Sequence, residues 1–464
     1  MYKIYLKNIE KTYEFVELIK LFLPPEQFTV CSENEFSEKD EELLVFHEND
    51  SEDKNTVKRN IFKKLSLLTG KQPPWGILTG VRPVKLTGEL YRKLGSYESV
   101  QRCLEEEYLV SAEKRELLLD TLKYQRQVLG PPPEKGIALY LGIPFCPTRC
   151  LYCSFTSNQK GPEEVERYLE ALITEIRFCG QRMKETGLWP ESVYIGGGTP
   201  TTLQAEQLER LMTEVENHID LSRTREFTVE AGRPDTITGE KLEVLKRHRV
   251  DRISINPQSM KKRTLELIGR SHEPEDVLNA FQTAAESGFS LINADVIAGL
   301  PEETPEDFQN TMRILIGLEP KNITVHTLAV KRASRLIDQD PDLHYRQAET
   351  VSRMLEISGR MLQAAGYRPY YLYRQKHMAG AFENVGYCRE NTPCIYNIRI
   401  MEEQQTVIAL GAGGISKVYF PAENRLERVP NVSNYEVYID RLAEMLDRKE
   451  QKLFKSSGDM SSEK

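Results

Sequence analysis

The apolar positions of the chain follow patterns that divide the sequence into three parts. From residue 1 to about residue 130, short apolar runs and amphipathic stretches predict a β-α-β-β-α unit followed by mostly helical, charged sequence. The elements expected in this N-terminal α+β extension are YKIYL, TYEFVELIKLF, QFTV, ELLVFH and VKRNIFKKLSLL. Three consecutive prolines at positions 131–133 form a stiff, extended break, so we expect a domain boundary there.

Between residues 137 and 365, six β-rich runs alternate with amphipathic helices. The runs are 137–144, 192–197, 226–232, 252–257, 291–300 and 323–330. The helix after the first run places Val165, Tyr168, Leu169, Leu172 and Ile176 on one face, with the 3.6-residue period. Strands that alternate with helices form right-handed crossovers and a parallel sheet. Six units rather than eight predict an α/β fold, a partial (β/α)6 TIM-like barrel with its site at the carboxyl ends of the strands.

After about residue 366 the pattern is that of a smaller α+β unit. The runs YRPYYLYRQ, CIYNIRIM and TVIALGAGGISKVYF are expected to be strands. A charged helix near residues 434–450 and a polar tail follow them. We expect residues 366–464 to form a small C-terminal domain that covers the substrate.

Composition and charge narrow the class of protein. A chain of 464 residues is long enough for two or three domains, and its formal net charge of −8 gives no global basic field that would attract nucleic acid. No apolar run reaches the length of a membrane span, and the N-terminus lacks the apolar core of a secretory signal. Eight cysteines are too few for a disulfide scaffold of this length. We therefore expect a cytoplasmic protein with reduced thiols and no nucleic-acid or membrane partner.

The segment LYLGIPFCPTRCLYCSF places Cys146, Cys150 and Cys153 directly after the first barrel strand. A structural zinc ion takes four ligands, and no other Cys or His follows closely enough to complete the set. A redox dithiol would need only Cys150 and Cys153 and gives Cys146 no role. An iron–sulfur cluster accounts for all three thiolates and leaves one iron open for another ligand.

Polar or glycine-rich segments also follow the later strands. The glycine run 196–198 allows a ligand to approach bare backbone, and it lacks the lysine and the spacing of a phosphate-binding P-loop. Glu230 ends the third strand, where a carboxylate is either solvated at the strand tip or held by a partner. Each such residue alone is compatible with a structural role, and together they have the pattern of a site at a barrel mouth. The others are Thr199, Gln258, Arg270, Asp295 and Ala329.

The spacing C-x3-C-x2-C, with Tyr152 before the last cysteine, resembles the motif of the radical S-adenosylmethionine (SAM) superfamily. The segments GGGTP, GILTGVRP, IPFCPTRCLYCSF and YYLYRQ make the chain similar to the oxygen-independent coproporphyrinogen III oxidases (dehydrogenases), in their HemZ-like branch. The resemblance runs from about Ala138 to Phe420, and the long N-terminal extension of that branch would match residues 1–130.

This resemblance implies a [4Fe–4S] cluster on Cys146, Cys150 and Cys153, whose open iron binds SAM. In well-studied members a second SAM lies beside the first. The implied SAM contacts are Tyr140, Tyr152, Gly197, Gly198, Thr199, Glu230, Gln258, Arg270, Asp295 and Ala329, of which Tyr140, Glu230 and Asp295 would also be catalytic. The implied activity is that of an oxidoreductase of heme biosynthesis, which decarboxylates two propionates of coproporphyrinogen III to give protoporphyrinogen IX. A protein such as flavodoxin or ferredoxin would supply electrons to the cluster.

Two positions depart from the family pattern. The oxidases usually read Y-x-H-I-P-F-C, and this chain has Gly142 at the histidine position. The segment LGAGGISKV is only loosely similar to the family's small-residue segment near SAM. The departures concern the second SAM and the substrate, and they do not affect the cluster.

Other functions share the motif. One is a heme-binding chaperone, because a relative of the family keeps the cluster motif and delivers heme. Another is a different radical enzyme that acts on heme or another tetrapyrrole. Modification of tRNA is disfavoured by the acidic charge and by the lack of a basic appended domain.

The carboxylates of a tetrapyrrole need cationic partners, preferably arginine. Position suggests Lys331, Arg332, Arg374 and Lys376, with solvated surface charges as the alternative. His326 is either a group at the barrel mouth or a hydrogen-bonded core histidine. Trp75 and the segment GVRPVK (80–85) are compatible with a docking face or a substrate lid. The remaining cysteines, Cys388 and Cys394 included, are expected to be ordinary buried residues.

Overall fold

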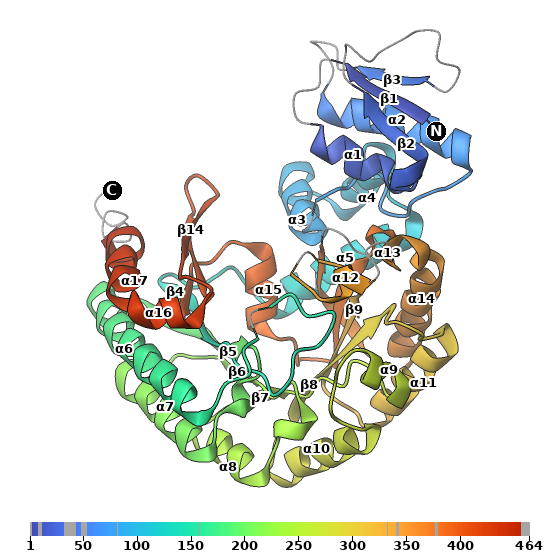
Figure 1. Cartoon of the computed structure of the whole chain (residues 1–464). Coiled ribbons are helices and arrows are strands. Elements are labelled where there is room, and N and C mark those ends of the chain that lie inside the picture. Colours follow the sequence, from blue (N-terminus) through green and yellow to red (C-terminus); the bar gives the residue numbers. More distant parts are fainter. Residues whose placement is uncertain are drawn as a thin grey trace.

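Two sheets organise the chain, a three-stranded sheet near the N-terminus and an eleven-stranded sheet that holds the rest (Figure 1). The structure is a computed structural model. It describes residues 2–7, 12–31, 43–47, 53–80, 82–155, 157–331, 333–339, 343–375 and 379–455. None of the helices described is both long enough and apolar enough to cross a bilayer.

The N-terminal lobe has the β-α-β-β-α order that the sequence predicts. Its elements are β1 (Tyr2–Lys7), α1 (Tyr13–Ile19), β2 (Phe28–Cys31), β3 (Leu43–His47) and α2 (Lys54–Thr69). Strand β1 lies in the centre and pairs with both neighbours in parallel. Ile4, Phe15 and Ile61 belong to one buried cluster, so both helices pack on the sheet through their apolar faces.

Three helices connect this lobe to the large sheet. They are α3 (Pro83–Leu94), α4 (Tyr97–Glu106) and α5 (Ala112–Val128). Helices α4 and α5 begin at serines, Ser96 and Ser111, whose hydroxyls accept hydrogen bonds from backbone N–H groups of the first turn. Gln125 of α5 donates a 2.8 Å hydrogen bond to the carbonyl of Tyr370, so α5 covers an edge of the large sheet.

Six parallel strands with crossover helices form the middle of the large sheet, as the sequence predicts. The strands are β4 (Gly136–Ile143), β5 (Trp189–Gly197), β6 (Glu226–Glu230), β7 (Arg252–Ser254), β8 (Leu291–Ala298) and β9 (Asn322–Thr327). The helices are α6 (Pro162–Thr186), α7 (Ala205–His218), α8 (Gly239–Arg247), α9 (Lys262–Leu267), α10 (Pro274–Glu286) and α11 (Pro305–Gly317). The helices surround the outer face of the curled sheet (Figure 1).

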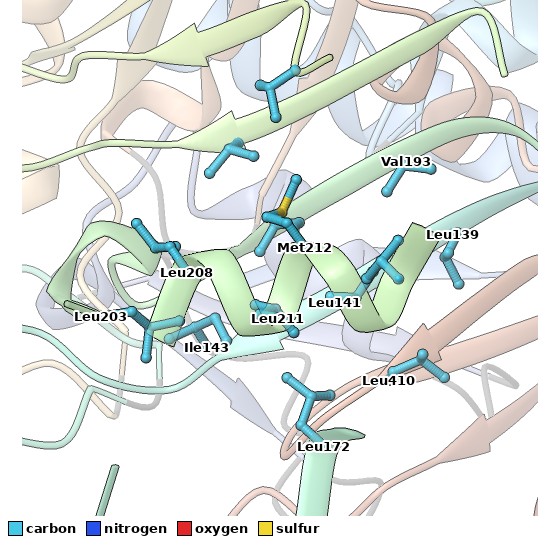
Figure 2. Packing of buried hydrophobic residues seen from close by; sticks show 14 of the residues in the cluster. Leu139, Leu141, Ile143, Leu172, Val193, Leu203, Leu208, Leu211, Met212 and Leu410 are labelled. Carbon is cyan, nitrogen blue, oxygen red and sulfur yellow. The ribbon is translucent and has the colours of Figure 1, made fainter. Parts of the chain in front are cut away.

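The main core lies between the strands and these helices. Leu139 and Leu141 of β4 point outward and belong to the same buried cluster as Leu172 of α6 and Leu211 of α7 (Figure 2). Because side chains alternate along a strand, Tyr140 points to the opposite, inner face. Full burial of one such leucine contributes about 1.5–3 kcal/mol to folding stability. Because the leucines are held on the outer face, the residues that alternate with them face the barrel interior.

The C-terminal part extends the same sheet at both ends. Short helices α12 (Leu336–Gln339) and α13 (Leu343–Arg346) and the longer α14 (Ala348–Ala364) come first, followed by β10 (Arg368–Arg374) and β11 (Glu383–Cys388), which continue the sheet beyond β9. Strands β12 (Val407–Leu410), β13 (Ile415–Phe420) and β14 (Arg425–Pro430) continue it beyond β4. The described chain ends with two helices and a last turn, which are α16 (Tyr435–Asp440), α17 (Leu442–Lys449) and Glu450–Phe454. The described sheet therefore ends at β10 and β14 and is a partial barrel.

The prediction of a strand at CIYNIRIM is wrong, because residues Ile395–Glu402 form helix α15. The buried carboxylate of Glu226 accepts hydrogen bonds from the backbone N–H groups of Ile395 and Tyr396 and so satisfies the start of the helix. Arg399 pairs with buried Glu191 at 2.9 Å. These tertiary contacts decide the structure, since the apolar pattern of the segment suits a strand or a helix equally.

Candidate cofactor site at the barrel mouth

A cavity of about 350 Å³ opens at the carboxyl ends of the barrel strands. The three motif cysteines line it together with nine of the ten predicted SAM contacts. These are Tyr152, Gly197, Gly198, Thr199, Glu230, Gln258, Arg270, Asp295 and Ala329. Tyr140 does not line it; its ring stacks against those of Tyr194 and Tyr396, with centroids 6.3 and 6.2 Å away. The fold thus brings these residues together, and their individual roles stay predictions.

The cysteine loop is held in place by its backbone. The Cys146 N–H donates to the Asn158 carbonyl at 3.0 Å, and the Leu151 N–H donates to the Ile268 carbonyl at 2.9 Å. All three thiols are free of disulfides. Burial raises the pKa of Cys146 to about 11 and also raises the pKa of Cys153. The thiolates therefore need a positive partner such as iron, and cluster assembly has to displace protons.

The donor set of this loop fits an iron–sulfur cluster better than a single metal ion. Among the residues described, no three His, Cys, Asp or Glu side chains are grouped so that they could hold one metal ion. A mononuclear zinc site requires such convergence. A cubane cluster offers each thiolate its own iron atom, so three thiols that line one cavity suit it.

Two buried arginines lie against the cysteine loop. Arg233, only 2% exposed, donates to the Thr148 hydroxyl at 2.9 Å, and its Nη1 lies 4.0 Å from the Cys150 Sγ. Arg270 donates to the Tyr152 hydroxyl at 3.3 Å. Asp235 pairs with Arg233 at 3.1 Å and fixes its direction. Sequence reasoning missed Arg233, since a single arginine in a post-strand loop belongs to no motif.

The glycine run serves close backbone packing against the cysteine strand. A Cβ atom at Gly198 would lie 2.4 Å from the Phe145 carbonyl oxygen, so only glycine fits there. The N–H groups of Gly198 and Thr199 donate to the carbonyls of Ile143 and Phe145, both at 2.7 Å. This pairing brings the Thr199 hydroxyl to 3.5 Å from the Cys146 sulfur.

Glu230 is a half-buried carboxyl at the cavity whose pKa is raised. Burial, reinforced by the charge of Asp295, raises its pKa from 4.5 to about 7. The hydrogen bond from the Tyr194 hydroxyl at 2.7 Å and the nearby imidazole of His326 act in the opposite direction. Glu230 can therefore accept or donate a hydrogen bond at physiological pH.

The pKa of Asp295, on β8 two strands away from Glu230, is shifted in the opposite direction. Burial favours its neutral form, but His326 and the amide of Asn293, which donates at 2.8 Å, outweigh that effect and lower its pKa. The Nε2 of His326 lies 3.6 Å from the carboxylate, and its Nδ1 lies 3.3 Å from the Tyr373 hydroxyl. His326 also lines the cavity, so the structure places it at the barrel mouth and not in the core.

Gln258 adopts a backbone conformation that is unusual for a residue with a side chain. Its φ is 66°, and its N–H and carbonyl bridge Asp295 and Ile297 of β8. Among the described residues, no partner hydrogen-bonds its buried Oε1. A left-handed non-glycine residue costs about 1 kcal/mol or more, and such strain is concentrated at functional sites. Gln258 thus holds an unsatisfied acceptor at the cavity.

The candidates for binding substrate carboxylates have different outcomes. Lys331 lines the cavity, and its ammonium lies 6.0 Å from the centre of the Phe155 ring. The prediction for Arg374 is wrong, because its guanidinium is buried outside the cavity and donates to the carbonyls of Ala381 and Leu78. Trp75 lies beneath it and donates to Glu383 at 2.7 Å, which makes it a buried anchor. Arg332 and Lys376 lie outside the described residues.

Comparison with known proteins agrees with this site. Residues 140–315 match the family described as the radical SAM superfamily. Over 457 residues the chain is 37% identical to the oxygen-independent coproporphyrinogen-III oxidase-like protein HemZ of Bacillus subtilis (strain 168), covering 95% of this chain and 90% of that protein. The chain therefore belongs to the radical SAM superfamily, in the family of this HemZ-like protein. Members of the superfamily use a [4Fe–4S] cluster and SAM, which agrees with the donor set of the cysteine loop.

Two further proteins are similar to part of the chain. The heme chaperone HemW of Bacillus subtilis (strain 168) is 34% identical over 237 residues, which is 50% of this chain and 61% of HemW. The structure of coproporphyrinogen III oxidase (HemN) from Escherichia coli, a radical SAM enzyme, superposes with a TM-score of 0.53 at 22% identity, over 69% of this chain and 72% of that one. The second likeness confirms the predicted radical SAM fold.

Proposed function

We propose that this radical SAM protein catalyses the anaerobic oxidative decarboxylation of two propionates of coproporphyrinogen III, giving protoporphyrinogen IX. The observation that carries the proposal is one cavity in which three free thiols meet a glycine-rich strand end and polar groups from successive strands. The likeness to a coproporphyrinogen-III oxidase-like protein along nearly the whole chain supports the substrate class. An electron-carrying protein and a cytoplasmic location belong to the same proposal.

Cys146, Cys150 and Cys153 would hold the cluster, and the wall opposite them would hold SAM. When bound, the cluster and SAM together supply the one-electron chemistry that removes a hydrogen atom from an unactivated carbon. Arg233 fixes the loop through Thr148, and its charge compensates the thiolates. The free acceptor of Gln258 and the carboxyl of Glu230 can receive hydroxyl or amine hydrogens of SAM.

The cavity itself is small for a tetrapyrrole. A volume of about 350 Å³ is near the lower end for ligand sites, so we assign it to SAM and to one propionate arm of the substrate. The macrocycle would then rest outside, against Phe155, which is 67% exposed at the cavity rim. Lys331, beside that ring, would bind a propionate, and buried Leu328 and Ile297 would keep water away from the reacting carbon.

The test is turnover by protein that has been reconstituted anaerobically with iron and sulfide and given SAM, a reductant and coproporphyrinogen III. Formation of 5′-deoxyadenosine together with the divinyl product supports the proposal. Formation of 5′-deoxyadenosine without a vinyl product contradicts the oxidase assignment and retains the radical chemistry. The Cys150→Ala variant should lose both products, and Cys103→Ala, far from the motif, should retain them.

Heme delivery is the second candidate, because the chain is also 34% identical to a heme chaperone over half its length. A chaperone of this kind would bind heme stably and would transfer it to an acceptor protein without consuming coproporphyrinogen. Titration of the reconstituted protein with heme, followed by absorbance, separates the two candidates. Stable stoichiometric heme binding together with an absence of vinyl product would favour the chaperone.

A further inference from the structure

Four cations gather where the N-terminal helices, α15 and the β13–β14 hairpin meet. Arg82, Lys85 and Lys417 lie 2.9, 3.3 and 3.6 Å from the carboxylate of Glu403, which follows the end of α15. Arg428 lies opposite Lys417 on the neighbouring strand. We name these four residues the cationic cluster. Within the described part of the chain, Glu403 is the one carboxylate that forms ion pairs with them.

The like charges of this cluster oppose one another. Lys417 and Arg428 are direct cross-strand partners, a position in which two charges of the same sign destabilise a sheet. Burial lowers the pKa of Lys417, and the charges of Arg82 and Arg428 lower it further. Burial and the charge of Arg428 also outweigh Glu403 in lowering the pKa of Arg82. One carboxylate therefore does not neutralise the four cations.

A small hollow lies next to the cluster and shares Lys85 with it. Its volume is about 110 Å³, and Arg92, Arg126 and Glu402 also line it. A water molecule occupies about 30 Å³ in the liquid, so the hollow has room for a carboxylate or phosphate group. The Nε of Arg82 is buried and has no hydrogen-bond partner among the residues described. The hollow thus adds cationic donors without adding an equal number of acids.

The rest of the hairpin shows that cations on this surface can have acidic partners close by. Arg425, three residues before Arg428, is exposed and pairs with both Glu423 and Glu427. Arg428 of the same strand is exposed as well, yet among the described residues it forms no ion pair with an acid, whereas Arg425 forms two. Figure 1 shows α15 between β14 and α3, so the cluster lies at the open side of the partial barrel, where three parts of the chain meet.

We infer that the cationic cluster binds a multiply charged oxyanion ligand, through carboxylate or phosphate groups. Arg82 and Arg428 offer paired N–H donors that match the two oxygens of such a group, and Lys85 and Lys417 add point charges. The ligand would supply the negative charge that Glu403 alone does not. The segment GVRPVK then has a binding role through Arg82 and Lys85. This site is separate from the cysteine loop and does not depend on the proposed decarboxylation.

The experiment measures binding to the cluster-loaded, anaerobic protein with SAM present to fill the barrel cavity. The probes are inorganic pyrophosphate, coproporphyrin III and its tetramethyl ester, which has no free carboxylates. We expect saturable binding of pyrophosphate or coproporphyrin III that weakens as salt is raised, and no comparable binding of the ester. Binding of pyrophosphate identifies phosphate as sufficient, whereas binding of coproporphyrin III alone identifies carboxylates on a macrocycle.

The variants are K417Q/R428Q and, as a matched control on the same hairpin, R425Q. Each charge-assisted contact removed should weaken binding by about tenfold, and R425Q should leave it unchanged. The double variant loses the repulsion between Lys417 and Arg428 together with the 3.6 Å ion pair of Lys417 and Glu403, so its thermal midpoint should change little, which separates lost binding from lost folding. If no anionic probe binds, or if K417Q/R428Q binds as tightly as the unmodified protein, the inference is overturned. Production of 5′-deoxyadenosine should be unaffected in either case.

Discussion

At the scale of single residues, the neighbouring groups decide which carboxyl groups of the cavity carry charge. Glu230 and Asp295 line the same cavity from β6 and β8, yet the pKa of Glu230 is raised and that of Asp295 is lowered. The difference comes from partners, because His326 lies 3.6 Å from Asp295 and Glu230 has a neutral tyrosine as its hydrogen-bond donor. Two carboxyl groups in one cavity thus have different protonation states near neutral pH.

Glu230 should make the stability of the protein depend on pH. Its folded pKa of about 7 lies above its ordinary value of 4.5, so the folded state binds the proton more tightly. Stability is then greatest below pH 4.5 with respect to this group and is lost as the pH rises to about 7, by up to about 3 kcal/mol. We expect Glu230→Gln to abolish this component. Thermal midpoints of both forms between pH 5 and 8 check it, and parallel curves would contradict it.

His326 should act by positioning Asp295. Replacement of His326 with Phe removes the partner that keeps the Asp295 carboxylate ionised, so its pKa should rise. We expect the acid limb of kcat/KM for SAM cleavage to move to higher pH, with about a tenfold loss at neutral pH. Tyr373→Phe, which keeps the imidazole beside Asp295, is the matched control and should leave the limb in place. An unchanged acid limb in His326→Phe would show that Asp295 needs no such partner.

At the scale of elements, the alternation of strands and helices could be predicted wherever periodicity and burial agree. The six barrel strands and the N-terminal β-α-β-β-α unit follow from their apolar patterns, and the cysteine loop follows from its spacing. Helix α15 could not be predicted, because its start is set by Glu226, which lies 169 residues earlier in the chain. The same limit applies to Arg374 and Arg233, whose partners come from distant segments.

The start of α15 should depend strongly on Glu226. This buried carboxylate pairs with Arg252 at 3.2 Å and satisfies two backbone N–H groups of the helix. Glu226→Ala leaves the arginine charge buried without its partner, so we expect a loss of about 3–5 kcal/mol in the free energy of unfolding. Urea unfolding of the apo protein measures it. Glu423→Ala, in an exposed ion pair, should change stability by no more than about 1 kcal/mol.

The end of strand β5 should control the cysteine loop. Gly198→Ala would force a Cβ against the Phe145 carbonyl and push β4 and β5 apart just before Cys146. We expect the variant to retain most of its helical content and to lose most of its iron and sulfide, as measured by chemical analysis after reconstitution. Gly239→Ala, where a Cβ meets open space, should load normally. A fully loaded Gly198→Ala protein would mean that the loop tolerates the displacement.

At the scale of the whole molecule, the boundary of the N-terminal lobe is open to a direct test. The cluster that packs β1, α1 and α2 is largely its own, whereas α5 packs on β10 and bonds to Tyr370. We expect a chain that starts at Gly70 to fold and to bind its iron–sulfur cluster. A chain that starts at Pro131 lacks α5 and uncovers a sheet edge, so it should aggregate. Equal behaviour of the two chains would place the boundary near residue 130, as the sequence alone predicts.

The open sheet also has a consequence for synthesis on the ribosome. Strand β4, which leads into the cysteine loop, gains its second neighbour only from β12, more than 260 residues later in the chain. At ordinary translation rates that interval is on the order of ten to fifty seconds. During this time one edge of β4 lacks its final partner, and the three thiols emerge before the barrel is complete. Nascent chains should therefore depend on chaperone protection, and iron starvation at this stage should increase their degradation.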